Sequence, residues 1–275
     1  MKDKIIAIQG AEGSNHHKVA RDFYGTSIQL KECMSFDVLV ASLLDKSANL
    51  GVMALENTIA GSIIPNYALI DNNNLHIVGE EYLNIHHHLM ALKGQEIAGI
   101  KEVWSHPMAL LQCKEFFKKH PHIKLVEDVD TAEVAKRIAK ENLKGIAAIA
   151  PKIAADIFDL HVVEDEIQTM KDNSTRFVIV QTELPELSEN VNKASLKFQL
   201  SHKRGSLAAI LNVLSDCKMN LTKIQSLPVI ESPWKYSFFV DVTFDDYKDY
   251  EKAKAIIEIM AEEFKILGTY KNGRK

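Results

Sequence analysis

The chain has 275 residues, which is enough for one large domain or two domains of ordinary size. Its 46% hydrophobic and 25% charged residues exclude a disordered or low-complexity protein. The formal net charge of −4 disfavours a nucleic-acid partner, and no apolar run is long enough to predict a membrane-spanning helix.

The first apolar run, Ile5–Ile8, predicts a short buried strand. It is too short for the hydrophobic core of a signal peptide, so we expect a cytoplasmic protein. Gly10 and Gly13 follow this strand. They are consistent with an ordinary strand-to-helix turn or with close approach of the backbone to an anion.

Short apolar runs alternate with helical patterns up to about residue 180. Helical spacing of apolar residues occurs over Leu110–Phe117 and Val134–Ala139. This alternation predicts an α/β architecture with largely parallel strands. The runs that predict strands are Ile5–Ile8, Gly51–Leu55, His76–Val78, Glu102–Trp104, Lys124–Val126, Ile146–Ile149 and Arg176–Gln181.

Three of these strands end in small polar residues of the kind that begin helices. They are followed by the segment 56–62, by Ser105 before Pro107, and by Asp130 with Glu133, which has the spacing of a capping box. The carboxyl ends of strands in an α/β sheet line the ligand crevice, and helix N-termini favour anions. A small polyanion is therefore the expected class of ligand.

Histidine and cysteine residues give little support for metal or redox chemistry. The groups His16–His17 and His86–His88 consist of adjacent residues, whose side chains diverge on a helix or a strand, so we expect no metal site. The spacing of Cys33, Cys113 and Cys217 fits neither a disulfide framework nor a metal site, and predicts three buried thiols.

The acidic, non-periodic segment 183–192 predicts a domain boundary near 182–194. Beyond it, the pattern predicts two helices and four strands in the order βαββαβ, which is ferredoxin-like. The expected strands are Ser195–Leu200, Leu221–Val229, Tyr236–Phe244 and Ile266–Tyr270, with a turn at 231–235. One helix carries Leu207, Ile210, Leu211 and Leu214, and the other carries Ala253, Ile256, Ile257, Met260 and Phe264.

Four motifs over residues 5–180 together resemble one known family. Asn173–Phe177 is similar to a threonine-arginine-phenylalanine signature, and Gly51–Ser62 to a glutamate-asparagine-serine segment. Ser105–Pro107, followed by Gln112, resembles a serine-histidine-proline helix start, and Gly10–Ser14 an N-terminal glycine turn. By their order and spacing the chain resembles the prephenate dehydratases.

Residues 195–270 resemble the ACT regulatory domain of these enzymes, through Gly205–Ala208 and Asn220–Thr222. The resemblance begins at the first strand, so we expect a monofunctional enzyme without a chorismate mutase domain. It implies a catalytic domain over 1–182, built like a periplasmic binding protein from two subdomains, about 1–80 with 155–182, and 80–155. An ACT domain over 193–275 is expected to follow.

The resemblance implies conversion of prephenate to phenylpyruvate, with loss of carbon dioxide and water and without a metal or organic cofactor. It implies feedback by L-phenylalanine, and a homodimer or homotetramer formed through the ACT domains. Thr175 is the expected catalytic residue, as a donor to the leaving hydroxyl. The expected substrate-binding residues are Glu56, Asn57, Thr58, Gly61, Ser62, Ser105, His106, Thr131, Asn173, Arg176 and Phe177. Those expected for the effector are Gly205, Ser206, Leu207, Ala208, Asn220, Leu221, Thr222, Gln225 and Ser226.

Several positions depart from the family pattern. Thr58 replaces a serine, Ala60 replaces a glutamate, and Gln225 and Leu227 replace the charged residues of a glutamate-serine-arginine-proline segment. Arg176 is consistent with a carboxylate partner or with a structural arginine. Two other functions remain: an arogenate dehydratase, and a non-catalytic amino-acid sensor. Thr175 argues against the sensor, which needs no donor to a leaving group.

Overall fold

The computed structural model describes residues 4–186, 190–229, 232 and 235–274, and the chain forms two compact units. Unit 1 comprises Met1–Ile63 and Tyr82–Phe177, and unit 2 comprises Ile64–Glu81 and Val178–Lys275. Strands β5 (His76–Asn84) and β11 (Ser174–Gln181) each contribute residues to both units, because the boundaries fall within them. The expected linker 183–192 and turn 231–235 lie partly outside the described residues.

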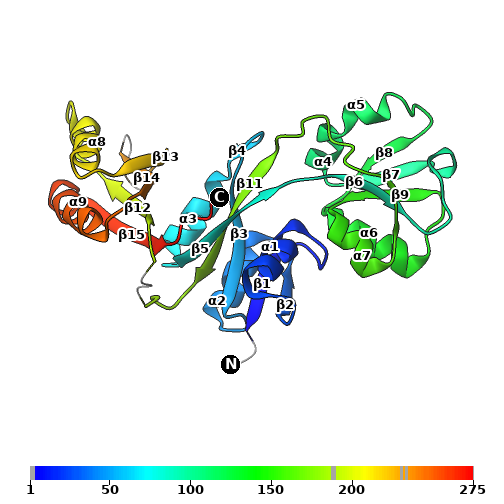
Figure 1. The fold of residues 1–275 in the computed structure, drawn as a ribbon, viewed down its shortest axis with the longest axis horizontal. Helices are drawn as coiled ribbons and strands as arrows, with labels where there is room; N and C mark the ends of the chain where they lie inside the picture. The colour runs from blue at the N-terminus through cyan, green and yellow to red at the C-terminus, as the bar shows by residue number, and fades with distance from the viewer. Residues whose placement is uncertain (1–3, 187–189, 230–231, 233–234, 275) are drawn as a thin grey trace. The chain divides into compact units, whose positions relative to one another are not determined.

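The first sheet of unit 1 is centred on the N-terminal apolar run. Strand β1 (Ile5–Gln9) pairs in parallel with β2 (Gln29–Cys33) and with β3 (Leu50–Asn57), and the sheet order is β2-β1-β3-β11-β5. Helices α1 (Asn15–Tyr24) and α2 (Phe36–Leu44) pack on these strands (Figure 1). The buried side chains of β1 and β3 therefore form the core beneath the loops that follow both strands.

The second sheet of unit 1 has the order β10-β6-β9-β7-β8. Strand β7 is parallel to β8 and β9, whereas β6 is antiparallel to β9 and β10. The expected parallel arrangement is thus confirmed for the α/β repeats and wrong for the two strands at the other edge. The strands are β6 (His88–Ala91), β7 (Glu102–Ser105), β8 (Lys124–Glu127), β9 (Ile146–Ala150) and β10 (His161–Glu164).

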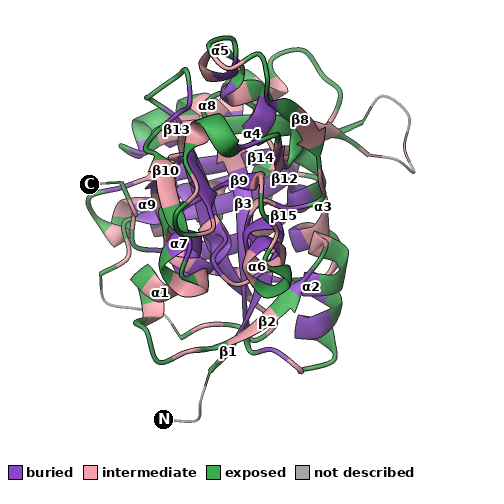
Figure 2. Ribbon diagram, turned by 90° about the vertical axis from the view of Figure 1, so that its right-hand side faces the viewer, coloured by how far each residue is buried: buried purple, intermediate pink, exposed green. Residues whose placement is uncertain are grey.

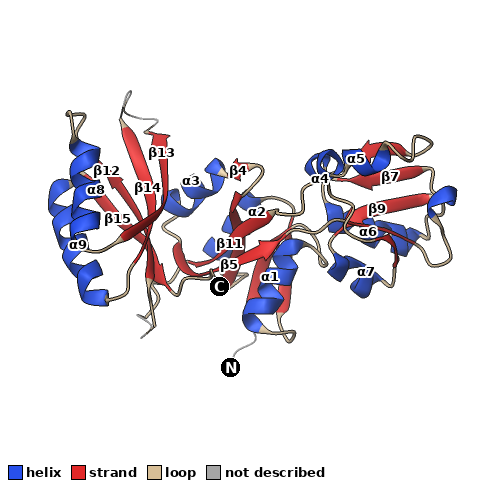
Figure 3. Cartoon of the chain, turned by 45° about the horizontal axis from the view of Figure 1, so that its top comes forward, coloured by secondary structure: helices blue, strands red, loops and turns tan. Residues whose placement is uncertain are grey.

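Both faces of this second sheet are covered, as its uninterrupted apolar strands require. Along β9, Ala147 and Ile149 pack with the helices α4 (Pro107–Gln112) and α5 (Lys114–Phe117). Ala148 and Ala150 pack on the opposite face with α6 (Thr131–Glu141) and α7 (Lys152–Phe158). Figures 1 and 3 show the two pairs of helices on opposite sides of the sheet. A short 3-10 helix, Ile97–Gly99, precedes β7.

Unit 2 contains the predicted βαββαβ order as a four-stranded antiparallel sheet, β13-β14-β12-β15. Helices α8 and α9 lie together on one face of that sheet (Figure 3), around a core that includes Phe198, Leu214, Val240 and Ile257. Figure 2 shows how the buried residues concentrate in the strands. The elements are β12 (Lys193–Gln199), α8 (Ser206–Asp216), β13 (Asn220–Pro228), β14 (Tyr236–Thr243), α9 (Tyr247–Met260) and β15 (Glu263–Tyr270).

The segment Ile64–Glu81 completes unit 2 through helix α3 (Ile64–Asn72) and the first part of β5. The Tyr67 ring lies edge-on to Phe239 of β14, with 5.4 Å between centroids. The Lys193 Nζ atom donates to both carboxylate oxygens of Glu80 at 2.8 and 2.9 Å, and both side chains are almost completely buried. Unit 2 thus combines an apolar contact with a buried ion pair between distant parts of the chain.

Three local expectations were wrong. The Leu110–Phe117 helix is interrupted at Cys113, which closes α4 and precedes α5. Phe264 belongs to β15 rather than to α9, because the chain becomes extended at Ala261. The segment 56–62 does not begin a helix, since its last two residues form β4 (Gly61–Ser62), which pairs antiparallel with β3.

The structure bears out the expectation for the cysteines: all three are free thiols and buried. Within the described ranges, no helix combines the length and apolar character that crossing a membrane requires.

Candidate active site

Residues from both sheets of unit 1 line a cleft of about 280 Å³. Six of the residues expected at the site from the sequence line it: Asn57, His106, Thr131, Asn173, Thr175 and Phe177. The others do not: Glu56, Thr58, Gly61, Ser62, Ser105 and Arg176. The lining also includes four polar residues outside the expected substrate-binding set, His16, His87, Gln112 and Asp130.

The turn after β3 is shaped by the Asn57 side chain. Its Oδ1 atom accepts hydrogen bonds from the backbone N–H groups of Ile59 and Ala60, both at 2.9 Å. This bend returns the chain to pair as β4, which explains why no helix begins here. Thr58 bridges to the first residue of β11, because its Oγ1 accepts from the Ser174 N–H at 2.9 Å. Asn57 is thereby held beside β11.

The same two backbone donors fix which way the Asn57 amide faces. With Oδ1 accepting, the Nδ2 group must donate, and it lies 2.8 Å from Thr175 Oγ1 and 2.6 Å from Asn173 Oδ1. Thr175, only 7% exposed, therefore uses its oxygen as an acceptor within the protein. No other hydrogen bond of the Thr175 side chain occurs among the described residues, so its hydroxyl hydrogen is free to donate into the cleft.

The direction of donation continues from Asn57 through Asn173 to Gln112. Because Asn173 Oδ1 accepts from Asn57, its Nδ2 donates, and it lies 3.1 Å from Gln112 Oε1. Gln112 Oε1 is then an acceptor, and its Nε2 group has no partner within the described part of the chain. Thr175 and Gln112 are thus two donors in one cleft.

The N-terminal ends of α1 and α6 meet at this cleft. Ser14 caps α1, and Asp130 caps α6 by accepting from the Ala132 and Glu133 N–H groups at 2.9 Å. The predicted capping residue Asp130 is confirmed. The predicted cap Ser105 is wrong: its fully buried hydroxyl donates to the Ile149 carbonyl, and His106 caps α4 instead. The first turns of both helices border the cleft, and a helix N-terminus favours an anion, but in α6 the Asp130 carboxylate already accepts two of the N–H groups.

Gly10 packs directly against the Asp130 carboxylate. A Cβ atom at Gly10 would lie 2.5 Å from Asp130 Oδ2, and the Gly10 φ angle is +86°. The close backbone approach expected at this glycine is therefore to a carboxylate of the chain itself. Burial raises the pKa of Asp130, against the opposing effect of its backbone hydrogen bonds.

The cleft contains no lysine or arginine among its described lining residues. Arg176, an expected carboxylate partner, is buried on β11 and does not reach it. A dianion bound there would be held by neutral donors and helix ends instead of by ion pairs, which favours precise orientation over long-range attraction.

His16 is a buried cleft residue with aromatic neighbours. Its ring lies edge-on to Phe177 at 4.9 Å and to Phe36 at 5.7 Å, and its buried Nε2 atom has no hydrogen-bond partner in the described part of the chain. Burial lowers the pKa of His16 to about 3. The folded protein therefore holds this ring neutral at pH values where the unfolded chain would protonate it.

We expect His16 to make the protein acid-sensitive. The pKa in the folded state lies below the unfolded value of 6.5, so the stabilising effect is present above pH 6.5 and is lost as the pH falls. From pH 7 to pH 5 this group lowers the free energy of unfolding by about 2 kcal/mol. Urea unfolding at both pH values measures this change in the free energy of unfolding. The change should be smaller in His16→Leu than in wild type. In the control His161→Leu, which replaces an exposed histidine, it should be the same as in wild type. Equal pH dependence in wild type and His16→Leu would contradict the assignment.

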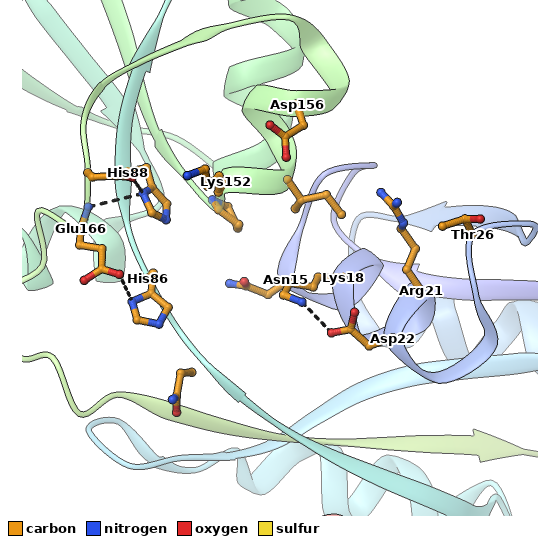
Figure 4. Close-up of a pocket in the computed structure, with 14 residues that line it drawn as sticks. Asn15, Lys18, Arg21, Asp22, Thr26, His86, His88, Lys152, Asp156 and Glu166 are labelled. Atoms are coloured by element: carbon orange, nitrogen blue, oxygen red, sulfur yellow. Dashed lines mark hydrogen bonds and ion pairs between the residues drawn. The ribbon is translucent and has the colours of Figure 1, made fainter.

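A second, larger cavity of about 520 Å³ in unit 1 lies between α1, α7 and the connecting segments near His86 and Glu166 (Figure 4). His86 and His88 line this cavity, and their Nδ1 atoms lie 3.2 Å from Glu166 Oε1 and 2.6 Å from Asp165 Oδ1. His87 lines the other cleft, as expected for alternating side chains. Three basic and four acidic side chains line the larger cavity, so its charge selects neither anions nor cations.

Unit 2 has a smaller cavity of about 120 Å³ at the start of α8. Of the residues expected to bind an effector, Ser206 and Leu207 line it. Gly205 immediately precedes them with a φ angle of +84°, a conformation that favours glycine. The remaining residues expected there do not line this cavity: Ala208, Asn220, Leu221, Thr222, Gln225 and Ser226.

Comparison with known families gives a match to a prephenate dehydratase model over residues 6–184. The chain is 34% identical over 279 residues to the arogenate dehydratase/prephenate dehydratase 2 of Arabidopsis thaliana, covering 96% of this chain and 72% of that protein. It is 30% identical over 237 residues to the bifunctional chorismate mutase/prephenate dehydratase of Buchnera aphidicola subsp. Acyrthosiphon pisum, covering 85% of this chain but only 62% of the relative.

Among solved structures, the prephenate dehydratase of Arthrobacter aurescens in complex with L-Phe has the same fold. The TM-score is 0.85 at 22% sequence identity, over 98% of this chain and 90% of the other.

Proposed function

Because the chain belongs to the prephenate dehydratase family, we propose that it converts prephenate to phenylpyruvate in L-phenylalanine biosynthesis. The observation that carries the proposal is the polarity of the Asn57–Thr175 hydrogen bond. It makes the threonine oxygen an acceptor inside the protein and leaves the hydroxyl hydrogen for a ligand in the cleft.

The reaction needs such a donor. The bond between the ring and its carboxylate breaks and releases carbon dioxide, and its electron pair moves into the ring. The bond from the ring to the hydroxyl breaks as the ring becomes aromatic, and the oxygen keeps the bonding pair and leaves as hydroxide, which a proton from the solvent converts to water. Thr175 acts as an oriented hydrogen-bond donor to that oxygen, because an alcohol is too weak an acid to give up its proton outright.

The remaining cleft residues suit the two carboxylates and the ring of prephenate. Asn57 donates to Thr175 Oγ1 and is itself held by Asn173 Oδ1. Thr131 and the first turns of α1 and α6 line the cleft where an anion would bind. Phe177 offers an apolar contact to the ring. Of the expected residues that do not line the cleft, Thr58 supports Asn57 by accepting from the Ser174 N–H on β11.

The proposed domain assignment follows the family resemblance. We assign residues 1–182 to catalysis, with subdomains of about 1–80 with 155–182, and 80–155, and residues 193–275 to an ACT regulatory domain. The family match ending at residue 184 and the βαββαβ order of β12 to β15 support this assignment. L-phenylalanine is the proposed effector, since the Arthrobacter aurescens protein was solved in complex with it.

The cavity at Ser206 and Leu207 is the proposed place of the effector in unit 2. A second copy of the ACT domain would complete it, which gives a homodimer or homotetramer. Effector binding then favours one of two states of the enzyme, and substrate affinity changes reciprocally. Gln225 and Leu227 stand where the family has charged residues, so fewer charges hold phenylalanine here.

We place the enzyme in the cytoplasm.

The decisive experiment measures phenylpyruvate formation from prephenate by its ultraviolet absorbance, with and without L-phenylalanine. We expect turnover that phenylalanine suppresses. Turnover without suppression would keep the catalytic assignment and reject the regulatory one. Absence of turnover by folded protein would contradict the proposed reaction.

Arogenate is the second candidate substrate, because the Arabidopsis thaliana relative carries both activities in its name. Arogenate has an ammonium group where prephenate has a keto group. Comparing kcat/KM for the two substrates decides between them, and we expect prephenate to have the larger value. A folded chain inactive on both, yet binding an amino acid, would instead be a sensor.

A further inference from the structure

His87 lies at the edge of the cleft with a single side-chain hydrogen bond. The residue is 6% exposed and sits between β5 and β6. Its backbone is fixed on both sides, since its N–H donates to Gln168 Oε1 at 2.9 Å and its carbonyl accepts from the Ile167 N–H at 2.8 Å. Its ring Nε2 atom lies 2.7 Å from Gln112 Oε1. The contacts place the ring in one position.

The direction of the hydrogen bonds that run from Asn57 to Gln112 determines which ring nitrogen of His87 carries hydrogen. Asn57 donates to Asn173, and Asn173 donates to Gln112 Oε1. An amide oxygen only accepts, so His87 Nε2 must also be a donor to it. Were Nε2 bare, two lone pairs would face each other at 2.7 Å. Turning the Gln112 amide over would instead bring its NH2 group against the NH2 group of Asn173.

The surroundings of the second ring nitrogen, Nδ1, independently support a hydrogen on Nε2. His87 Nδ1 is buried and has no hydrogen-bond partner among the residues that the structure describes. A hydrogen on that atom would be a buried donor lacking an acceptor, which is costly, whereas a lone pair there costs less. Burial also lowers the pKa of His87, which keeps the ring neutral near pH 7.

We propose that His87 is a positioning residue: in its neutral Nε2–H form it holds the Gln112 amide oxygen, so that the Gln112 NH2 group faces the cleft as a donor to the anionic substrate. The kinetic part of this inference rests on the proposed reaction. The protonation of the ring does not.

Nitrogen-15 NMR of the full chain labelled at histidine tests the ring directly. His87→Gln identifies the His87 signals by their loss. We expect hydrogen on Nε2 and none on Nδ1 at pH 7. His88 provides the internal contrast, because its Nδ1 faces the Asp165 carboxylate at 2.6 Å. Hydrogen on Nδ1 of His87 would overturn the proposal, even if the chain proved inactive on prephenate.

Kinetics on prephenate tests the consequence. His87→Ala removes the donor, and we expect kcat/KM to fall on the order of tenfold, the scale of one hydrogen bond. His87→Gln keeps an N–H group near the position of Nε2 and should recover most of that loss. His161→Gln, at an exposed histidine on β10, is the matched control and should match wild type. Wild-type kcat/KM in His87→Ala, or no recovery in His87→Gln, would overturn the positioning role, and circular dichroism separates either result from misfolding.

Discussion

Replacing Thr175 with valine is expected to lower kcat for prephenate by about 100-fold or more while the chain remains folded. Valine has nearly the shape of threonine and fills the same buried position, so it removes the hydroxyl with little change in packing. The loss falls on kcat because the hydrogen bond to the departing oxygen strengthens as negative charge develops on it. Asn57 Nδ2 also loses one acceptor but keeps Asn173 Oδ1.

Two further variants sharpen this test. Thr175→Ser retains a hydroxyl that Asn57 can hold and should restore most of the activity, whereas Thr175→Ala should behave like valine. Steady-state kinetics gives the effect, and circular dichroism with urea unfolding reports on the fold. If Thr175→Val turned over prephenate at the wild-type rate, Thr175 would not be the donor.

The second large effect is on stability. Lys193→Met is expected to lower the free energy of unfolding by about 3–5 kcal/mol, because it removes the buried cation that donates to both oxygens of the buried Glu80 carboxylate. The backbone N–H of Gly273 remains as a donor to Glu80 Oε1 at 3.0 Å, which compensates only in part. Urea unfolding of the full chain measures the change.

A surface pair in the same unit provides the control. Lys235 Nζ lies 3.0 Å from Glu262 Oε2, and both side chains are well exposed, so Lys235→Met should cost at most about 1 kcal/mol. Combining Lys193→Met with Glu80→Leu removes both buried charges and should recover much of the lost stability. A loss in Lys193→Met no larger than that in Lys235→Met would show that the buried pair contributes little.

The sequence predicts most of the apolar strands, including the four antiparallel strands of unit 2, but it does not predict β2, β6 or β10. Strands β1, β3, β7, β8 and β9 were predicted because each is a short apolar run. Strand β2 was missed: Gln29, Lys31 and Glu32 break up its apolar pattern, and only Cys33 is buried. Its strand conformation comes from pairing with β1. Because β1 lies about 24 residues earlier in the chain, a local sequence pattern does not reveal this pairing.

The residues of the candidate site also fall into those that the sequence predicts and those that it does not. Thr175 on β11 is expected from the resemblance of its segment to a family signature, and the capping residue Asp130 from its local spacing, whereas neither predicts the chain of amides. Asn57 and Thr175 are 118 positions apart, and His87 meets Gln112 from another segment. Alternation of side chains along an extended segment predicts that His87 points away from His86 and His88. Only the fold shows that it points to Gln112.

The discontinuous make-up of unit 2 has a consequence for exchanging parts between relatives. A graft that joined foreign sequence anywhere between residues 184 and 193 would follow the end of the family match, yet it would separate Lys193 from Glu80 and Phe239 from Tyr67. Such a chimera would have to re-create a buried charge pair and an aromatic contact across two parental sequences. The C-terminal part is therefore not a self-contained cassette, and a transferable version would include residues 64–81.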